Sequence, residues 1–242
     1  MNRAMYAAAS GMAAQQQNLE IIADNLANAD VAGFKSAAAS FADVNAGGTL
    51  GLGTESLGKH ALFVQGKLEK SGGPFDLAID GAGFFCVEKD GQFAYTRAGS
   101  FSRSPDGSVR NADGWRLRGV HIPADGLRVD VGGDGRVFVD RPGATHVAAG
   151  RVDLASFIAP EHLRALSGTL FTASPQSGAP QIFHPGDGAK TTLAFGMLEK
   201  SNVSIVESMM AIMTAQRAYE ANAKGVQAAD EMLRIANNLH RS

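Results

Sequence analysis

The distribution of Gly, Pro and Met divides this 242-residue chain into segments of two different kinds. All eight Pro lie between Pro74 and Pro185, and 26 of the 29 Gly fall within residues 47–196. The eight Met occur only in residues 1–12 and 197–232. Gly and Pro disfavour helix, whereas Met is a good helix former. The sequence therefore predicts helical ends that resemble each other and a middle of a different class.

The N-terminal segment carries a heptad-like apolar stripe from Arg3 to about Asn28, with Gly11 as its main turn signal. A seven-residue apolar period predicts a helix with a narrow seam for a partner helix. The polar end of this segment, followed by Gly33, is typical of a helix C-terminus. The stripe consists of Met5, Met12, Leu19 and Leu26.

The C-terminal segment repeats this design over a longer stretch. Ser204 and Glu207 have the spacing of a capping box, which starts a helix. A helix from Ser204 to Asn238 would be about 50 Å long. Its apolar row at seven-residue spacing consists of Ile205, Ile212, Tyr219, Val226 and Leu233.

Both stripes are narrow and rich in Ala, as seams between helices are. We expect the two terminal helices to pair as a coiled-coil-like domain and to contact neighbouring subunits. The alternative is a pair of ordinary amphipathic helices packed on one core.

Asp-Gly turns and short β-prone runs fill the middle of the chain. Residues 84–87 and 93–96 flank the turn at 90–91, and residues 129–131 and 136–139 flank another, so each pair predicts a hairpin. The predicted fold class is α+β, with an all-β central domain between the terminal helices. The predicted domains are 1–35 (N-terminal helix), 36–74 (extended connector), 75–196 (central β domain) and 197–242 (C-terminal helix).

Composition and motifs exclude several classes of function. The net charge of −2 argues against a nucleic-acid binder, and no apolar run is long enough to span a membrane. Residues 53–59 match a phosphate-binding loop, but His60 replaces its Mg²⁺-binding Ser or Thr. The six His are scattered and Cys86 is the only Cys. We nominate no catalytic, cofactor-binding or metal-binding residue, and we expect no cleaved signal peptide.

Several motifs, in order along the chain, resemble those of bacterial flagellar rod and hook proteins. The N-terminal ones are Asp24-Asn25-Leu26-Ala27-Asn28 and Gly33-Phe34-Lys35, and the central ones span residues 76–85 and 95–101. The C-terminal ones are Glu199-Lys200-Ser201-Asn202-Val203 and Gln216-Arg217-Ala218-Tyr219-Glu220-Ala221-Asn222. Within the family, Gln216–Glu220 and the early Ser10-Gly11-Met12-x-Ala14 resemble the distal-rod branch. The short stretch between Phe41 and Gly58 leaves the proximal-rod branch open.

The resemblance implies a structural subunit of the flagellar basal-body rod, the driveshaft that crosses the periplasm. Such subunits are exported unfolded by the flagellar export apparatus and polymerise helically, with paired terminal helices inside and a β domain outside. The implied partners are further copies of the chain, other rod subunits, the hook protein and the P- and L-ring bushing, with no nucleic acid and no insertion into the membrane.

Assembly roles are expected for both helical rows and for a set of residues from the family motifs. Asn25 and Asn28 would cap or cross-link helix ends, and Gly33 would supply a turn with positive φ. Arg217 and Glu220 would pair with neighbouring subunits, although a solvated charge pair is the alternative. A secreted β-rich binding module remains the competing class, and Trp115 is the only Trp available to it. The remaining motif residues in the set are Phe34, Asn202 and Gln216.

Overall fold

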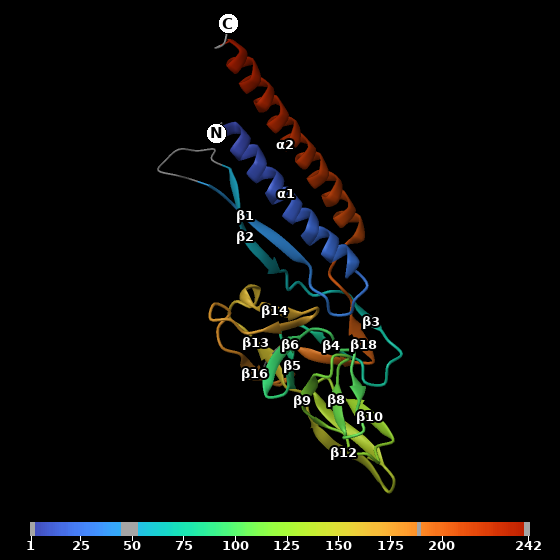
Figure 1. Ribbon diagram of the computed structural model, residues 1–242. Coiled ribbons are helices and arrows are strands. Elements are labelled where there is room, and N and C mark those ends of the chain that lie inside the picture. Colours follow the sequence, from blue (N-terminus) through green and yellow to red (C-terminus); the bar gives the residue numbers. More distant parts are fainter. Residues whose placement is uncertain (1–2, 45–52, 188–189, 240–242) are drawn as a thin grey trace. The chain divides into compact units, whose positions relative to one another are not determined.

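A computed structural model describes residues 3–44, 53–187 and 190–239 of the chain, which divides into two compact units (Figure 1). Unit 1 comprises Met1–Ala29, Ser36–Leu62 and Val203–Ser242. Unit 2 comprises Asp30–Lys35 and Phe63–Asn202. Unit 1 holds both long helices and unit 2 holds most of the strands, so the predicted α+β class is confirmed.

Unit 1 is built from the helices α1 (Arg3–Ala27) and α2 (Ile205–Leu239) and the strands β1 (Ala37–Asp43) and β2 (Thr54–Ala61). The two helices pack side by side and run antiparallel (Figure 1). The strands pair antiparallel, and both contact α1. The capping prediction holds at the start of α2, where the Glu207 amide donates to Ser204 Oγ at 3.4 Å.

The segment predicted as an extended connector, 36–74, is organised differently. Residues 37–43 and 54–61 form the β1–β2 pair, and the segment Ser36–Leu62 belongs to unit 1. The pairing was not apparent from the sequence because the strand β1 is mostly Ala, which has little β propensity. The rest of the segment, from Phe63, belongs to unit 2.

The largest sheet of unit 2 has twelve strands among the described residues, with a main order of β10-β11-β12-β9-β5-β6-β15-β14. Strand β13 pairs with β5 and β16, and β8 pairs with β7 and β9. The strands are β5 (Phe84–Lys89), β6 (Gln92–Thr96), β7 (Ser102–Arg103), β8 (Ser108–Arg110), β9 (Arg116–His121), β10 (Arg128–Val131), β11 (Arg136–Arg141), β12 (Ala144–Arg151), β13 (Leu154–Ser156), β14 (Arg164–Ser167), β15 (Leu170–Thr172) and β16 (Gln181–Phe183), and a short 3-10 helix spans Pro160–His162.

Both predicted hairpins are present in this sheet. Strands β5 and β6 pair from Phe85↔Thr96 to Lys89↔Gln92, and β10 pairs with β11. At the first turn, Asp90 and Gly91 have φ values of 51° and 77°. A two-residue turn whose backbone matches the twist of the strands needs positive φ at both positions, which Asp-Gly tolerates.

Two further strand pairs close unit 2 by joining its two ends. The strand β4 (Leu77–Asp80) pairs with β17 (Thr192–Phe195), and β3 (Leu68–Lys70) pairs with β18 (Met197–Glu199). The apolar core includes side chains from β4, β5, β9, β11, β13, β15 and β17. Unit 2 therefore extends beyond the predicted limits of 75–196 at both ends.

Candidate assembly surface

Small residues line the contact between α1 and α2. A Cβ atom placed on Gly11 would lie 2.9 Å from Asn222 Nδ2, and one on Gly225 would lie 3.8 Å from Ala8 Cβ. On α2, Ala215 and Ala229 are only 3 % and 2 % exposed. Small side chains let the two helix backbones approach closely, so the Ala-rich composition of both segments has a direct structural reason.

Asn25 joins α1 to the strand pair of unit 1. Its side-chain amide donates to the Ala37 carbonyl at 2.8 Å, and its Oδ1 accepts from the Ala37 amide at 2.8 Å. Asn25 is 8 % exposed, so these two bonds satisfy a polar group that would otherwise be costly to bury. The side chain thereby fixes the start of β1 against the helix.

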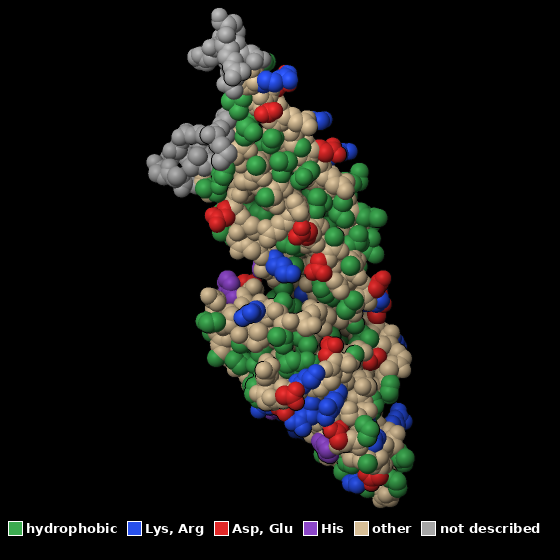
Figure 2. Space-filling model, in the orientation of Figure 1, with side chains coloured by type: hydrophobic (Ala, Val, Ile, Leu, Met, Phe, Trp, Pro, Cys, Tyr) green, Lys and Arg blue, Asp and Glu red, His purple; other side chains and the backbone are tan. Residues whose placement is uncertain are grey.

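Most of the exposed large apolar side chains of unit 1 lie on α2. Figure 2 shows many hydrophobic side chains over the region of the helices, interspersed with other residues. Large apolar side chains scattered singly are normal on a protein surface, whereas a group on successive turns, such as the one between Ile205 and Met213, marks an interaction site. The nine exposed ones on α2, among its described side chains, are Ile205, Val206, Met209, Met210, Met213, Tyr219, Met232, Leu233 and Ile235.

The rows predicted as the helix seam do not coincide with the most buried rows. Met5, Met12, Leu19 and Leu26 are half-buried, whereas Ala14 and Ile21 are the buried apolar residues of α1. On α2, Ile212 and Val226 are half-buried, and Ile205, Tyr219 and Leu233 are 48 %, 39 % and 37 % exposed. The predicted α2 row therefore lies beside the α1–α2 contact and is partly available to another chain.

The other predicted residues have local roles that the structure defines. Asn28 donates to the Asp24 carbonyl at 2.8 Å, next to the end of α1. Gly33 has φ +70°, as expected, and a Cβ there would overlap the backbone of Ala98. Asn202 Nδ2 donates to the Val64 carbonyl at 3.2 Å. Phe34 is buried, and Gln216, Arg217 and Glu220 are exposed.

A buried cluster of three charges lies within unit 2. Lys35 Nζ is 2.6 Å from Glu199 Oε1, and Arg97 Nη1 is 3.3 Å from Glu199 Oε2. Lys35 and Glu199 have fully buried side chains, and that of Arg97 is 5 % exposed. The cluster joins three of the motifs noted in the sequence, which are far apart along the chain.

Backbone groups also bind the charged side chains of this cluster. Lys35 Nζ also donates to the Val64 carbonyl at 2.7 Å, and Glu199 Oε1 accepts from the Gly66 amide at 2.8 Å. Arg97 Nη2 donates to the Gly81 carbonyl at 2.8 Å. Burial lowers the pKa of Lys35 below its ordinary value of 10.5, against the opposing hydrogen bond and charge of Glu199.

Sequence reasoning did not nominate Lys35, Arg97 or Glu199 as site residues. Charged residues in such motifs are most simply read as solvated, and nothing in the sequence pairs positions 102 and 164 residues apart. The available signal was their position inside the family motifs, next to Gly33 and Asn202. Their role is structural, because they hold three distant segments of unit 2 together.

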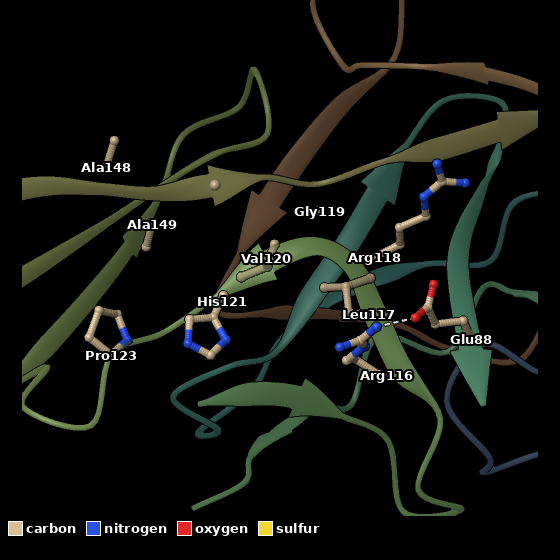
Figure 3. A pocket seen from close by; sticks show the side chains of 11 residues that line it. Glu88, Arg116, Leu117, Arg118, Gly119, Val120, His121, Pro123, Ala148 and Ala149 are labelled. Carbon is tan, nitrogen blue, oxygen red and sulfur yellow. Dashed lines mark hydrogen bonds and ion pairs between the residues drawn. The ribbon is translucent and has the colours of Figure 1, made fainter. Parts of the chain in front are cut away.

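A cleft of unit 2 with a volume of about 590 Å³ lies where β9 and β12 diverge (Figure 3). These strands pair only at Val120↔Gly150. Glu88 and Arg116 form an ion pair in the cleft, so both charges are compensated.

Within residues 3–44, 53–187 and 190–239, no group of three or more His, Cys, Asp or Glu has the arrangement of a metal site. No helix in the same ranges is apolar enough over sufficient length to cross a membrane.

Three family models match the chain in succession. Residues 5–35 match the model described as flagella basal body rod protein. Residues 78–139 match the flagellar hook protein FlgE/F/G D1 domain, and residues 195–239 match the flagellar basal body rod FlgEFG protein C-terminal model. The first and last matches fall on the two helices and the motifs beside them.

Curated relatives match over the whole chain. The flagellar basal-body rod protein FlgG of Borreliella burgdorferi is 36 % identical over 264 residues, covering 100 % of both chains. FlgG of Agrobacterium fabrum is 36 % identical over 258 residues, covering 97 % of this chain and 98 % of its own. The rod protein FlgF of Caulobacter vibrioides is 32 % identical over 248 residues, covering 98 % and 97 %. The chain therefore belongs to the flagellar basal-body rod protein family.

Proposed function

We propose that the chain is a distal-rod subunit of the bacterial flagellum that polymerises helically through its terminal helices. The exposed apolar surface of α2 is the observation that carries this proposal. Nine large apolar side chains on one helix would be unfavourable in a monomer in water, and contacts with other copies would cover them. Coiled-coil-like packing between α1 and α2 would make each subunit stiff where it joins the helical polymer.

The family supports a structural role in the basal body. The relatives named FlgG, which correspond to the distal-rod branch, reach 36 % identity over essentially the whole chain. The FlgF relative reaches 32 %, so the proximal rod is the second candidate. A secreted binding module is not favoured, because the family matches cover both helices as well as the β domain.

A subunit of the rod would contact the neighbouring parts of the flagellum. They are further copies of the chain, neighbouring rod subunits, the hook protein and the P- and L-ring bushing around the rod. The flagellar export apparatus would deliver the chain unfolded and without a cleaved signal peptide. We propose no catalytic step, cofactor or nucleic acid for this function.

Assembly of the purified chain tests the proposal. Full-length protein should form rod-like polymers above a critical concentration, visible by electron microscopy and measurable by sedimentation. Tyr219→Asp should raise that concentration by about 100-fold or more, because burying an unpaired charge costs several kcal/mol and about 1.4 kcal/mol corresponds to a factor of ten.

Gln227→Asp is the matched control, since it introduces the same charge at an exposed polar position of α2. It should assemble nearly as the unmodified chain does. Polymerisation of Tyr219→Asp at the concentration of the unmodified chain would contradict the proposal, as would a full-length chain that stays monomeric at all concentrations.

A further inference from the structure

A groove in unit 1 lies between α1 and the β1–β2 pair. It has a volume of about 400 Å³ and is lined by small or uncharged residues of α1, including Ser10, Ala13 and Ala14. Tyr6 stands beside them and is 56 % exposed. Glu55 of β2 is the charged residue of the lining. The groove therefore combines small apolar side chains, hydroxyl and amide groups, an exposed aromatic ring and one carboxylate.

The surface of α1 beside this groove is unusually poor in charge. Among the 25 residues of α1, only Arg3, Glu20 and Asp24 are charged. A helix face that meets water normally carries more charge, since roughly a quarter to a third of a soluble surface is Lys, Arg, Asp and Glu. The pair of strands beside it is also a weak element alone, because an isolated two-stranded hairpin is marginally stable in water. Both features favour a covered groove.

The α2 helix presents a matching surface on its far side from α1. With 3.6 residues per turn, Val206, Met210 and Met213 lie on the side of α2 opposite Ala215, which is buried. These three side chains are 68 %, 56 % and 56 % exposed. Arg217 follows Met213 by one turn on the same side. This side of α2 therefore carries exposed apolar side chains, two of them flexible Met, followed by the positively charged Arg217.

The two surfaces carry opposite charges, and the flexible Met side chains can adapt to the groove. Unbranched Met side chains fill irregular apolar grooves, and their sulfur makes favourable contacts with aromatic rings such as that of Tyr6. Glu55 and Arg217 have opposite charges, and neither has an ion-pair partner among the described residues of the same chain. The Met row and the groove lie on different faces of unit 1, so one chain can offer each to a different neighbour.

We propose that the α2 row of Val206, Met210 and Met213 in one copy of the chain docks into the α1–hairpin groove of the next copy, with Arg217 placed against Glu55. This inference rests on the proposed function and identifies one contact without which the polymer cannot form. Because the donor row and the acceptor groove are different surfaces, the contact is heterologous. A heterologous contact repeats from copy to copy and generates open helical assemblies, whereas a self-complementary contact stops at a dimer.

Mixing two blocked variants tests this contact in the full-length chain. Ala13→Glu places a charge in the acceptor groove, and Met210→Glu/Met213→Glu places two in the donor row. All three positions are exposed, so both variants should fold, which circular dichroism checks. Each variant alone should stay monomeric, and the mixture should form a 1:1 dimer of twice the 25.2 kDa chain mass, because one intact donor and one intact acceptor remain.

Ala23→Glu on α1 and Gln227→Glu on α2 are the matched controls, and both should polymerise as the unmodified chain does. If the unmodified chain polymerises but the mixture stays monomeric, the docking is overturned and the proposed function stands. Assembly of either blocked variant alone overturns the docking too. An unmodified chain that never polymerises overturns both.

A charge exchange tests the ionic contact separately. Glu55→Arg and Arg217→Glu should each raise the critical concentration about tenfold, and the double variant should return it to within about threefold of the original. Lack of rescue in the double variant would overturn the placement of Arg217 against Glu55.

Discussion

The Nζ atom of Lys35 lies 2.6 Å from Oε1 of Glu199, and neither side chain is exposed to solvent. The two residues are 164 positions apart in the sequence. Arg97 approaches the other carboxylate oxygen at 3.3 Å, so one anion holds two buried cations. The cluster makes the folding of unit 2 depend on residues from both of its ends.

Removal of the shared anion should destabilise unit 2 strongly. Glu199→Gln leaves Lys35 and Arg97 buried without an anionic partner, and breaking a buried ion pair in this way costs about 3–5 kcal/mol. Glu69→Gln is the matched control on the paired strand β3, because Glu69 contacts Lys67 and Lys200 at the surface. An exposed pair contributes about 0–1 kcal/mol. Urea unfolding of the two variants measures the difference, and equal losses would contradict the role of the cluster.

Gly33 should be far less replaceable than Gly91, although both have positive φ, +70° and +77°. A Cβ added at Gly91 would have no atom within 4 Å. Gly91→Ala should therefore lower the unfolding free energy only by the conformational cost of placing Ala at positive φ, about 1 kcal/mol. Gly33→Ala has the same conformational cost and also places a Cβ against the backbone of Ala98. That backbone cannot move without disturbing unit 2. The loss of unfolding free energy for Gly33→Ala should be at least twice as large in urea denaturation. Similar losses for the two variants would refute the close approach at Gly33.

The central β domain should depend on segments outside the predicted limits. A fragment of residues 76–195 lacks Lys35 and Glu199 and leaves Arg97 without an anionic partner. A fragment of residues 30–202 retains the cluster and the β3–β18 pair. The longer fragment should unfold cooperatively at a higher temperature in calorimetry. An equal melting temperature for the shorter fragment would show that the end segments are dispensable.

The single thiol provides a probe of unit 2. Burial, with a smaller effect of the Asp153 charge, raises the pKa of Cys86 from 9.0 to about 12. Iodoacetamide reacts with thiolate, so at pH 8 the native chain should be labelled at least 100-fold more slowly than the urea-unfolded chain. Labelling at similar rates would contradict the burial of Cys86.

The same thiol should contribute to the pH dependence of stability. Well below pH 9 the thiol is mainly protonated in both the folded and the unfolded chain. Between pH 9 and 12 only the unfolded chain ionises, so the contribution of Cys86 to stability is lost as the pH rises through 12. The Cys86→Ala variant should show a shallower decline in unfolding free energy above pH 9, and a parallel decline would contradict this assignment.

Local patterns in the sequence identified much of this fold. The Asp90-Gly91 turn fixes both the position and the register of the β5–β6 hairpin, and Ser204 with Glu207 marks the start of α2. Such signals act over a few residues and can be recognised directly. The β1–β2 pair was missed because Ala-rich strands carry no alternating apolar pattern.

The candidate site was less accessible to sequence reasoning. The predicted α2 row followed large apolar residues such as Ile205 and Tyr219, but the contact with α1 uses Ala215 and Ala229. A helix with apolar residues on several faces does not reveal from sequence which face meets which partner. The Lys35–Glu199–Arg97 cluster depends on contacts over more than 100 residues, which no local pattern encodes.

The structure of the polymer itself tests the central claim most directly. Cryo-electron microscopy of filaments grown from the purified full-length chain would show which surfaces are buried between copies. We predict that α1 and α2 of neighbouring copies form a continuous helical layer in which Met210, Met213 and Tyr219 are covered. Filaments held together by unit 2 alone, with the apolar face of α2 left in solvent, would contradict the account.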